Sequence, residues 1–139
     1  MPRLVLASTS RYRAELLARL RLPFDSVRPA VDEAPLPGEP PASLALRLAA
    51  AKAGAIAALR ADAVVIGSDQ VASCDGRTLG KPGTREQAIA QLQAMSGREA
   101  VFLTAVAVAA PGGKIETALD TTTVRFRPIP LKNSVESAG

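Results

Sequence analysis

The sequence predicts an α/β domain with a mixed central sheet and flanking helices. Short apolar runs typical of buried strands alternate with segments of helical periodicity, which is the first observation behind this fold class. The second is composition: 47% of the 139 residues are apolar and 22% are charged, as in a globular domain with its own core. The third is continuity, since neither a linker nor an internal repeat divides the chain.

The first half of the chain predicts strand, turn, helix, strand, loop and helix in that order. A short buried strand is expected at 3–7 (RLVLA), followed by the hydroxyl-rich turn STSRYR and a helix through ELLARL. A second strand is expected at 22–28 (LPFDSVR). Five prolines between residues 29 and 41 require a loop, and the Ala- and Leu-rich residues 42–60 predict a long helix.

The second half predicts further strands and one more helix. A strand is expected at 62–74, and the turn signal DGR at 75–77 predicts a hairpin there. The stretch TREQ has the spacing of a capping box at the start of a helix. Two long strands are expected at 99–110 and 115–127, joined by PGGK. We expect this terminal ribbon to lack an obvious cover.

The composition excludes several classes of function. The chain has no histidine, which removes Ser-His and Cys-His nucleophilic systems, so any metal would be a hard, oxygen-bound ion such as Mg²⁺ or Mn²⁺. The lone Cys74 excludes an internal disulfide and fits a reducing cytoplasm. No apolar stretch is long enough to span a membrane. A net charge of +4 weakly favours anionic ligands, and 3% aromatic residues argue against a base-stacking nucleic-acid surface.

Asp69 and Gln70 are adjacent polar residues that follow the apolar run AVVI. A buried strand thus delivers a carboxylate and an amide to a sheet edge. The residues alone leave three interpretations of Asp69 open: a turn residue, a metal ligand or a general base. Cys74 has no visible base partner and is interpreted as a small structural residue.

The turn between the first strand and the first helix is a candidate anion site. Ser8 and Ser10 supply hydroxyl groups and Arg13 supplies charge, at a place where backbone N–H groups and the helix dipole favour an anion. An ordinary N-cap followed by a solvated basic helix explains the same residues.

Lys52 falls inside the apolar stripe of the helix predicted at 42–60. That stripe consists of Leu44, Leu48, Ala55 and Leu59. A lysine there either extends its ammonium group to solvent or meets an anion. Lys81, taken alone, is a loop lysine, and Glu33 is an acidic loop residue of a kind that is usually solvated. Together with Asp69, Glu33 could complete an oxygen-ligand site for Mg²⁺, which suits metal-assisted attack on a phosphate ester or anhydride.

Seven motifs occur in order along the chain: LVLASTSRYRAELL, VDE, RLAAAKA, VVIGSDQV, DGRTLGKP, LQAMSGR and TTTVRFRP. In this combination the sequence resembles the Maf family of nucleotide pyrophosphatases over most of its length. The resemblance implies a fold of the Maf and inosine-triphosphatase type, with a cleft beside a mixed sheet. It also implies hydrolysis of nucleoside triphosphates to the monophosphate and pyrophosphate with a divalent metal cation. No nucleic-acid or membrane partner is implied, and a homodimer stays open.

The resemblance also assigns roles to individual residues. It makes Asp69 the catalytic proton acceptor and a metal ligand, with Glu33 as the second metal ligand. Phosphate-binding roles fall on Ser8, Ser10, Arg13, Lys52 and Lys81.

Tyr12 and Gln70 stand at the two positions that set the subfamily. Members acting on dTTP and UTP usually have Arg and Thr there, whereas this pair is similar to the subfamily acting on 7-methyl-GTP. The chemistry agrees, because 7-methylguanine is cationic and an aromatic face attracts a flat cation. The Gln amide offers a donor and an acceptor to the edge of a base.

Family members continue well beyond the VRFRP motif, whereas this chain ends in PLKNSVESAG. We therefore expect residues 1–128 to form a Maf-like domain without the last part of the family fold, and residues 129–139 to be a divergent, disordered tail. Three rival hypotheses remain: a dTTP or UTP pyrophosphatase, a relative that binds nucleotide without hydrolysing it, and an aggregating remnant. Nucleic-acid binding through the basic charge would need a basic stripe with aromatic residues, which the sequence does not show.

Overall fold

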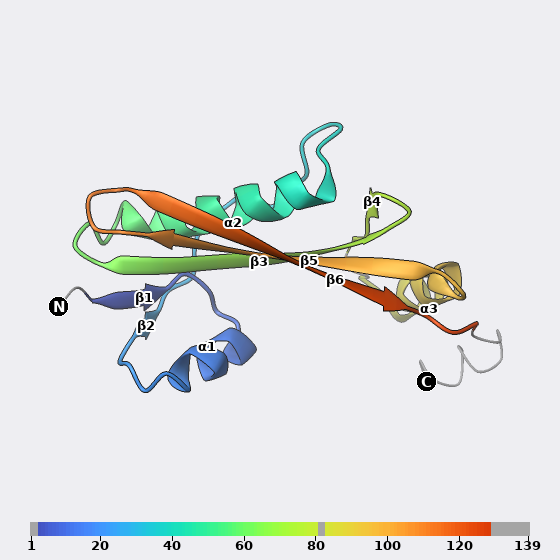
Figure 1. Ribbon diagram of the computed structural model, residues 1–139, viewed down its shortest axis with the longest axis horizontal. Helices are drawn as coiled ribbons and strands as arrows, with labels where there is room; N and C mark the ends of the chain where they lie inside the picture. Colours follow the sequence, from blue (N-terminus) through green and yellow to red (C-terminus); the bar gives the residue numbers. More distant parts are fainter. Residues whose placement is uncertain (1–2, 81–82, 129–139) are drawn as a thin grey trace.

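A computed structural model describes residues 3–80 and 83–128, without the side chain of Tyr12. The elements in chain order are β1 (Leu4–Leu6), α1 (Arg11–Ala18), β2 (Asp25–Ser26), α2 (Pro41–Ala57), β3 (Val64–Cys74), β4 (Arg77–Thr78), α3 (Arg85–Met95), β5 (Glu99–Ala109) and β6 (Ile115–Arg125). The strands form one long sheet, with α2 along one face and α1 on the other (Figure 1). Among the described helices, none has the length and apolar composition needed to cross a membrane.

The sheet is mixed, which confirms the predicted fold class. Its strand order is β2-β1-β3-β5-β6, and β4 pairs with the far end of β3. β1 runs parallel to β2 and β3, whereas β5 runs antiparallel to both β3 and β6. β1 pairs only with residues 64–66 of β3 and β4 only with residues 73–74, so no described strand covers the edge between them. This open edge lies just beyond the carboxyl end of β1, a common place for ligands in α/β sheets.

The core lies between α2 and the two central strands. Its buried residues are mostly small or β-branched and include Leu44, Ala45, Leu48, Ala49, Ala53 and Ile56 of α2 and Val65, Val71, Leu103, Ala105 and Ala107 of the strands. Small side chains let α2 approach β3 closely at Gly67. A Cβ atom on Gly67 would stand 2.5 Å from the Ala49 carbonyl oxygen and 2.7 Å from the Ala53 nitrogen. This close approach holds the middle of α2 directly against β3.

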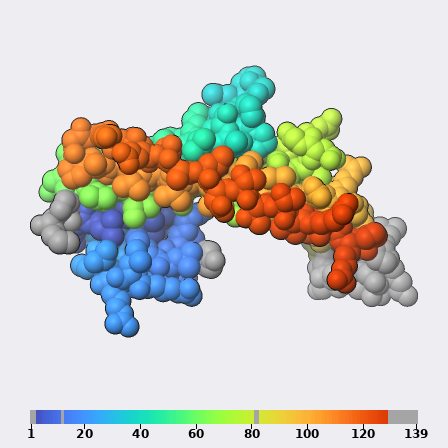
Figure 2. All heavy atoms as spheres, viewed as in Figure 1, coloured from blue at the N-terminus to red at the C-terminus, as the bar shows by residue number. Residues whose placement is uncertain are grey.

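On the opposite face of the sheet, a cleft separates α1 from the strands at one end, and α3 packs against the other end. At the α3 end, Met95 packs with Cys74 and Ala100. Between the two helices Val106 and Val108 of β5 remain 38% and 37% exposed, and all eleven residues of β6 are exposed. Figure 2 shows the hollow below the sheet, beside the blue N-terminal part of the chain. Within the described residues, the expectation that the terminal ribbon lacks a cover is confirmed for β6 and for this face of β5, whereas α2 covers the other face of β5.

Several local predictions are confirmed by backbone geometry. The hairpin turns at Asp75 and Gly76, which have φ values of 54° and 78°. The Thr84 hydroxyl accepts a hydrogen bond from the Gln87 nitrogen at 3.1 Å and caps α3. The side chain of Cys74 is buried, which is consistent with a structural residue.

Two predictions were wrong in detail. The strand expected at 22–28 is only Asp25–Ser26, because the short β1 offers few backbone partners. Leu59 was expected in the buried stripe of α2 but is 76% exposed, since the helix ends at Ala57 and the chain turns away. The buried stripe runs through Leu44, Leu48 and Ile56, and it still includes the position of Lys52.

Candidate active site

Lys52 is the centre of a cluster of three charged side chains. Its ammonium nitrogen lies 2.8 Å from Oδ1 of Asp69 and 2.9 Å from Oε1 of Glu33. The Lys52 and Asp69 side chains are only 14% and 12% exposed, whereas Glu33 is 54% exposed at the solvent side. Three elements therefore meet at one cation: α2, β3 and the proline-rich loop. The inward lysine predicted from periodicity meets anions rather than solvent.

The charge state of this group follows from its surroundings. Burial lowers the pKa of Lys52, but the hydrogen bonds to Asp69 and Glu33, reinforced by their negative charges, outweigh burial and raise it above its ordinary value. Lys52 is therefore charged at neutral pH and draws the two carboxylates to one point.

The turn between β1 and α1 forms a second wall beside this group. The Ser8 hydroxyl oxygen accepts a hydrogen bond from the Ser10 nitrogen at 3.0 Å, and Ser10 caps α1 by accepting from the Arg13 nitrogen at 3.3 Å. Ser8 is 9% exposed. The cap confirms the ordinary interpretation of these hydroxyls, and it also turns the first N–H groups of α1 toward the end of β1, where an anion is favoured.

The proline-rich loop that carries Glu33 is fixed to α2 by a bidentate ion pair. Arg47 Nε donates to Glu39 Oε2 at 2.7 Å and Nη2 donates to Oε1 at 3.0 Å. The same guanidinium donates to the Ala34 carbonyl oxygen at 3.1 Å, and the Arg47 contact lowers the pKa of Glu39. The loop is thereby held where Glu33 reaches Lys52.

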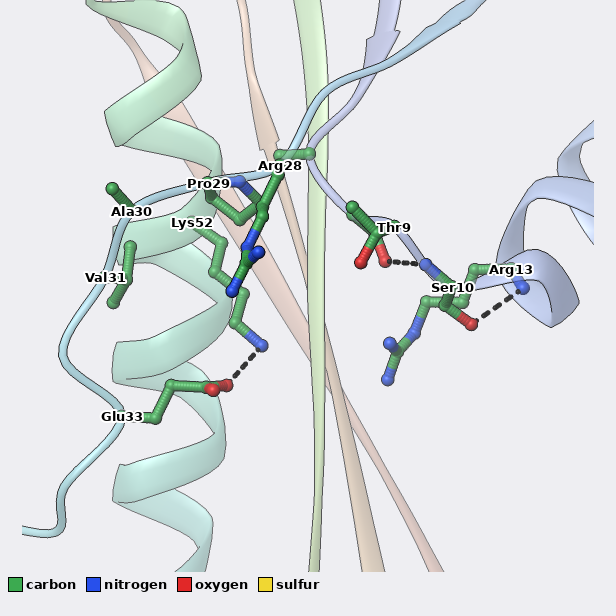
Figure 3. Close-up of a pocket in the computed structure, with 11 residues that line it drawn as sticks. Thr9, Ser10, Arg13, Arg28, Pro29, Ala30, Val31, Glu33 and Lys52 are labelled. Carbon is green, nitrogen blue, oxygen red and sulfur yellow. Dashed lines mark hydrogen bonds and ion pairs between the residues drawn. The ribbon is translucent and has the colours of Figure 1, made fainter.

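These walls enclose a cleft of about 560 Å³, which we call the first cleft. Its lining includes Ser8, Ser10, Arg13, Arg28, Glu33 and Lys52. Figure 3 shows Glu33 and Lys52 on one side of it and Ser10 and Arg13 on the other. Asp69 is not among the residues that line the first cleft; its Oδ1 accepts a hydrogen bond from the Lys52 ammonium group, which does line it.

A second cleft of about 720 Å³ lies on the other face of the sheet, between α1 and the strands. Its apolar lining includes Leu6, Leu16, Leu17, Leu20, Ile66 and Val106, and its polar lining includes Ser68, Gln70 and Thr104. Gln70 Nε2 donates to Thr104 Oγ1 at 3.4 Å. The Ser68 hydroxyl oxygen is buried and has no hydrogen-bond partner among the described residues.

The two clefts are connected at the start of α1, because Ser10 and Arg13 line both of them. Side chains alternate along β3, so the neighbours Asp69 and Gln70 point to opposite faces of the sheet. Asp69 contacts α2, and Gln70 lines the second cleft. A ligand that reached both residues would have to cross the open edge of β3.

Most predicted site residues lie around these two clefts. Ser8, Ser10, Arg13, Glu33 and Lys52 line the first cleft and Gln70 lines the second, whereas Asp69 lines neither and contacts the site through Lys52. Lys81 and the side chain of Tyr12 lie outside the described residues. Sequence reasoning missed Arg28, which was the last residue of the strand expected at 22–28. It also missed Ser68, although Ser68 stands two residues from Gln70 and so shares its face of the strand.

A divalent metal would find few protein ligands in this site. Among the described residues no group of three or more Asp, Glu, Cys or His side chains could hold a metal ion. Glu33 and Asp69 do converge, on the Lys52 ammonium. Magnesium in nucleotide enzymes is usually held by one or two carboxylates plus substrate phosphates and water. Two converging carboxylates therefore fit a metal that arrives with its substrate.

Comparison with known proteins decides the family. The Maf-like protein family matches residues 3–135, nearly the whole chain. The chain belongs to the Maf family. This match covers both clefts and extends into the tail for which no resemblance was expected.

Two curated relatives within the Maf family are more than half identical to this chain. It is 60% identical over 129 residues to a 7-methyl-GTP pyrophosphatase of Xanthomonas campestris pv. campestris, covering 93% of this chain and 67% of that protein. It is 57% identical over 128 residues to a 7-methyl-GTP pyrophosphatase of Bordetella pertussis, covering 92% and 64%. The chain thus spans about two thirds of the length of these relatives.

The fold is shared with more distant proteins of known structure. The Staphylococcus aureus Ham1 protein matches with a TM-score of 0.64 at 17% identity, over 88% of this chain and 71% of that one. A nucleoside-triphosphatase (dITP/XTP pyrophosphatase) of Mycobacterium abscessus matches with a TM-score of 0.57 at 19% identity, over 92% and 76%. These similarities confirm the predicted fold type.

Proposed function

We propose that this chain is a nucleoside triphosphate pyrophosphatase that hydrolyses 7-methyl-GTP to 7-methyl-GMP and pyrophosphate. The observation that carries the proposal is the convergence of Asp69 and Glu33 on Lys52, beside the hydroxyl-lined turn of Ser8 and Ser10. The site thus combines a cleft lined by cationic groups with a buried carboxylate next to it, and water attack on a phosphoanhydride needs both. The names of relatives at 60% and 57% identity support the same reaction.

The reaction assigns one task to each wall of the first cleft. Asp69 accepts a proton from a water molecule, whose oxygen forms a bond to the α-phosphorus as the bond to the bridging oxygen breaks. Pyrophosphate leaves, and the proton stays on Asp69 until it is lost to solvent. Lys52, Arg13 and the Ser8–Ser10 turn bind phosphate oxygens and stabilise the negative charge that develops on them. Lys81 joins them in this proposal.

A divalent cation, Mg²⁺ or Mn²⁺, would be held by Asp69 and Glu33. When bound, such an ion neutralises phosphate charge and polarises the phosphorus–oxygen bonds. Lys52 draws both carboxylates to a single point, so their oxygens are already close together before a metal–nucleotide complex arrives.

The second cleft is the proposed site of the base. A nucleotide with its phosphates in the first cleft would pass Ser10 and Arg13 and cross the open edge of β3. Its base would then lie among apolar side chains beside the Gln70 amide. Tyr12 would add an aromatic face for the cationic 7-methylguanine ring.

The test compares substrates and one variant. Purified chain is incubated with Mg²⁺ and 7-methyl-GTP, GTP, dTTP or UTP, and released pyrophosphate is measured. We expect 7-methyl-GTP to be preferred, and Asp69→Asn to lower kcat by roughly 10²- to 10⁴-fold. Asp62→Asn, an exposed aspartate outside both clefts, is the matched control and should keep full activity.

Each other outcome identifies a rival. Preference for dTTP or UTP would overturn the substrate assignment but keep the reaction. Nucleotide binding by calorimetry without any pyrophosphate release would identify a binding protein. Equal rates for Asp69→Asn and the unmodified chain would overturn the catalytic role of Asp69.

A further inference from the structure

Arg28 is a cationic residue of the first cleft to which no role has been assigned above. It follows β2, and the Val27 nitrogen donates to the Leu6 carbonyl oxygen at 2.9 Å. This bond fixes the backbone of Arg28 next to the end of β1, where the turn of Ser8 begins. Figure 3 shows the Arg28 guanidinium extending into the cleft on the side of Lys52.

Within the part of the chain that the structure describes, the charge balance of the cleft leaves Arg28 without an acidic partner. Both carboxylates of the group, Glu33 and Asp69, contact Lys52. Among the described residues, no carboxylate lies within ion-pair distance of the Arg28 or Arg13 guanidinium. Two such guanidinium groups lining one cleft favour an anion with several charged oxygens.

The position of Arg28 indicates which part of a nucleotide it meets. Arg13 and Ser10 line both clefts, so they lie on the path from base to phosphates. Arg28 lines only the first cleft, together with Glu33 and Lys52. The phosphates farthest from the base would therefore lie nearest Arg28.

We propose that Arg28 binds the terminal phosphates of the substrate and so the departing pyrophosphate. This inference rests on the proposed function. The planar guanidinium presents parallel N–H groups that match two non-bridging phosphate oxygens, which makes the contact charge-assisted and bidentate. Arg28 thereby holds the β- and γ-phosphates while Lys52 and Asp69 act at the α-phosphorus.

Calorimetry in Mg²⁺ buffer tests this without turnover, with inorganic pyrophosphate and 7-methyl-GMP as probes. We expect Arg28→Gln to raise the Kd for pyrophosphate by roughly 10- to 100-fold and the Kd for 7-methyl-GMP by less than about threefold. Arg28→Lys should recover only part of the pyrophosphate affinity, since ammonium cannot bind in the bidentate mode. Arg77→Gln removes the same charge from an exposed site on β4, outside both clefts, and should leave both affinities unchanged.

Four outcomes would overturn the inference: no pyrophosphate binding by the unmodified chain, unchanged pyrophosphate binding in Arg28→Gln, an equal loss for both probes, or an equal loss in Arg77→Gln. Thermal melts check that the variants fold, which is expected because Arg28 is exposed. The chain could fail to hydrolyse any triphosphate and yet lose pyrophosphate affinity in Arg28→Gln. That result would contradict the proposed function but support this inference.

Discussion

The two faces of β3 differ in how their polar groups are satisfied. On the α2 face, Asp69 pairs with Lys52 at 2.8 Å within a core of small apolar side chains. On the other face, the buried Ser68 hydroxyl has no partner among the described residues, and the nearby Gln70 amide makes only a long contact to Thr104 at 3.4 Å. One strand therefore presents a buried ion pair on one side and, on the other, a buried hydroxyl without a described partner beside an exposed amide.

This difference indicates how the two faces are used. Paired charges in a rigid core are preorganised, which suits groups that must hold reacting phosphates in place. Unsatisfied polar groups beside apolar side chains suit recognition, because a base can supply the missing hydrogen bonds. Variants on the α2 face of β3 should therefore change mainly stability, whereas variants on the face that lines the second cleft should change mainly nucleotide binding.

The largest effect is expected from Gly67→Ala. The new methyl group would stand 2.5 Å from the Ala49 carbonyl oxygen and 2.7 Å from the Ala53 nitrogen, and these backbone atoms can move only if α2 moves. We expect a loss of about 3 kcal/mol in the free energy of unfolding, measured by urea denaturation, and a loss of activity because Lys52 moves with α2. Gly80→Ala, with no atom within 4 Å of its new Cβ, is the control. Equal stability of the two variants would contradict the close packing of α2 on β3.

Lys52→Met is expected to have the next largest effect. It leaves the buried Asp69 without its cation, and we expect the free energy of unfolding to fall by about 2 kcal/mol. Breaking a fully buried ion pair costs ~3–5 kcal/mol, and the loss is smaller here because Glu33 is half exposed. The raised pKa of Lys52 also sets a pH dependence. The ion pair stabilises the fold fully below the ordinary lysine pKa of about 10.4 and is lost as the pH rises through the raised value.

Unfolding in urea at pH 8 and pH 11 checks this sign. The stability difference between the unmodified chain and Lys52→Met should be smaller at pH 11, which lies above the ordinary pKa of lysine, because the unfolded chain then holds the Lys52 proton less tightly than the folded chain does. A difference that stays constant, or grows, would show that the ion pair does not stabilise the fold.

On the α2 face of β3, the inward position of Lys52 could be predicted from the sequence. Helical spacing alone placed Lys52 on the buried side of α2, because residues four apart share a face whatever the helix packs against. The same reasoning failed at Leu59, which lies beyond the end of the helix at Ala57. Periodicity gives the face of a side chain but not the residue at which the helix stops.

The face of β3 that lines the second cleft was harder to predict, because its structure depends on contacts between segments far apart in the sequence. The polar pair Asp69 and Gln70 does not end its strand, which continues to Cys74; what ends nearby is the pairing with β1 at Ile66. Local sequence carries little information about where a neighbouring strand stops. Arg28 was missed for the same reason, since the predicted strand included it and the actual strand ends at Ser26.

A pair of valine variants measures the difference in packing between the faces. Val65 and Val108 stand on neighbouring strands, but Val65 is 0% exposed on the α2 face and Val108 is 37% exposed on the other. Threonine has nearly the same shape as valine, so each change mainly adds a hydroxyl group. We expect Val65→Thr to cost about 1–3 kcal/mol in unfolding free energy and Val108→Thr less than about 0.5 kcal/mol. Similar losses of unfolding free energy in the two variants would mean that the face of the sheet with Val108 is covered in solution.

Ser68→Ala is expected to have a small effect on stability, opposite in sign to those of the other variants. Removing a buried hydroxyl that has no partner relieves its desolvation cost, so the unfolding free energy should rise by up to about 1 kcal/mol. Affinity should move the other way if the hydroxyl meets the base. Calorimetry should then show weaker binding of 7-methyl-GMP, by roughly 3- to 10-fold, with unchanged affinity for inorganic pyrophosphate. Ser26→Ala, exposed on β2, is the control for both measurements. A variant that gains stability without losing nucleotide affinity would place the base elsewhere than the second cleft.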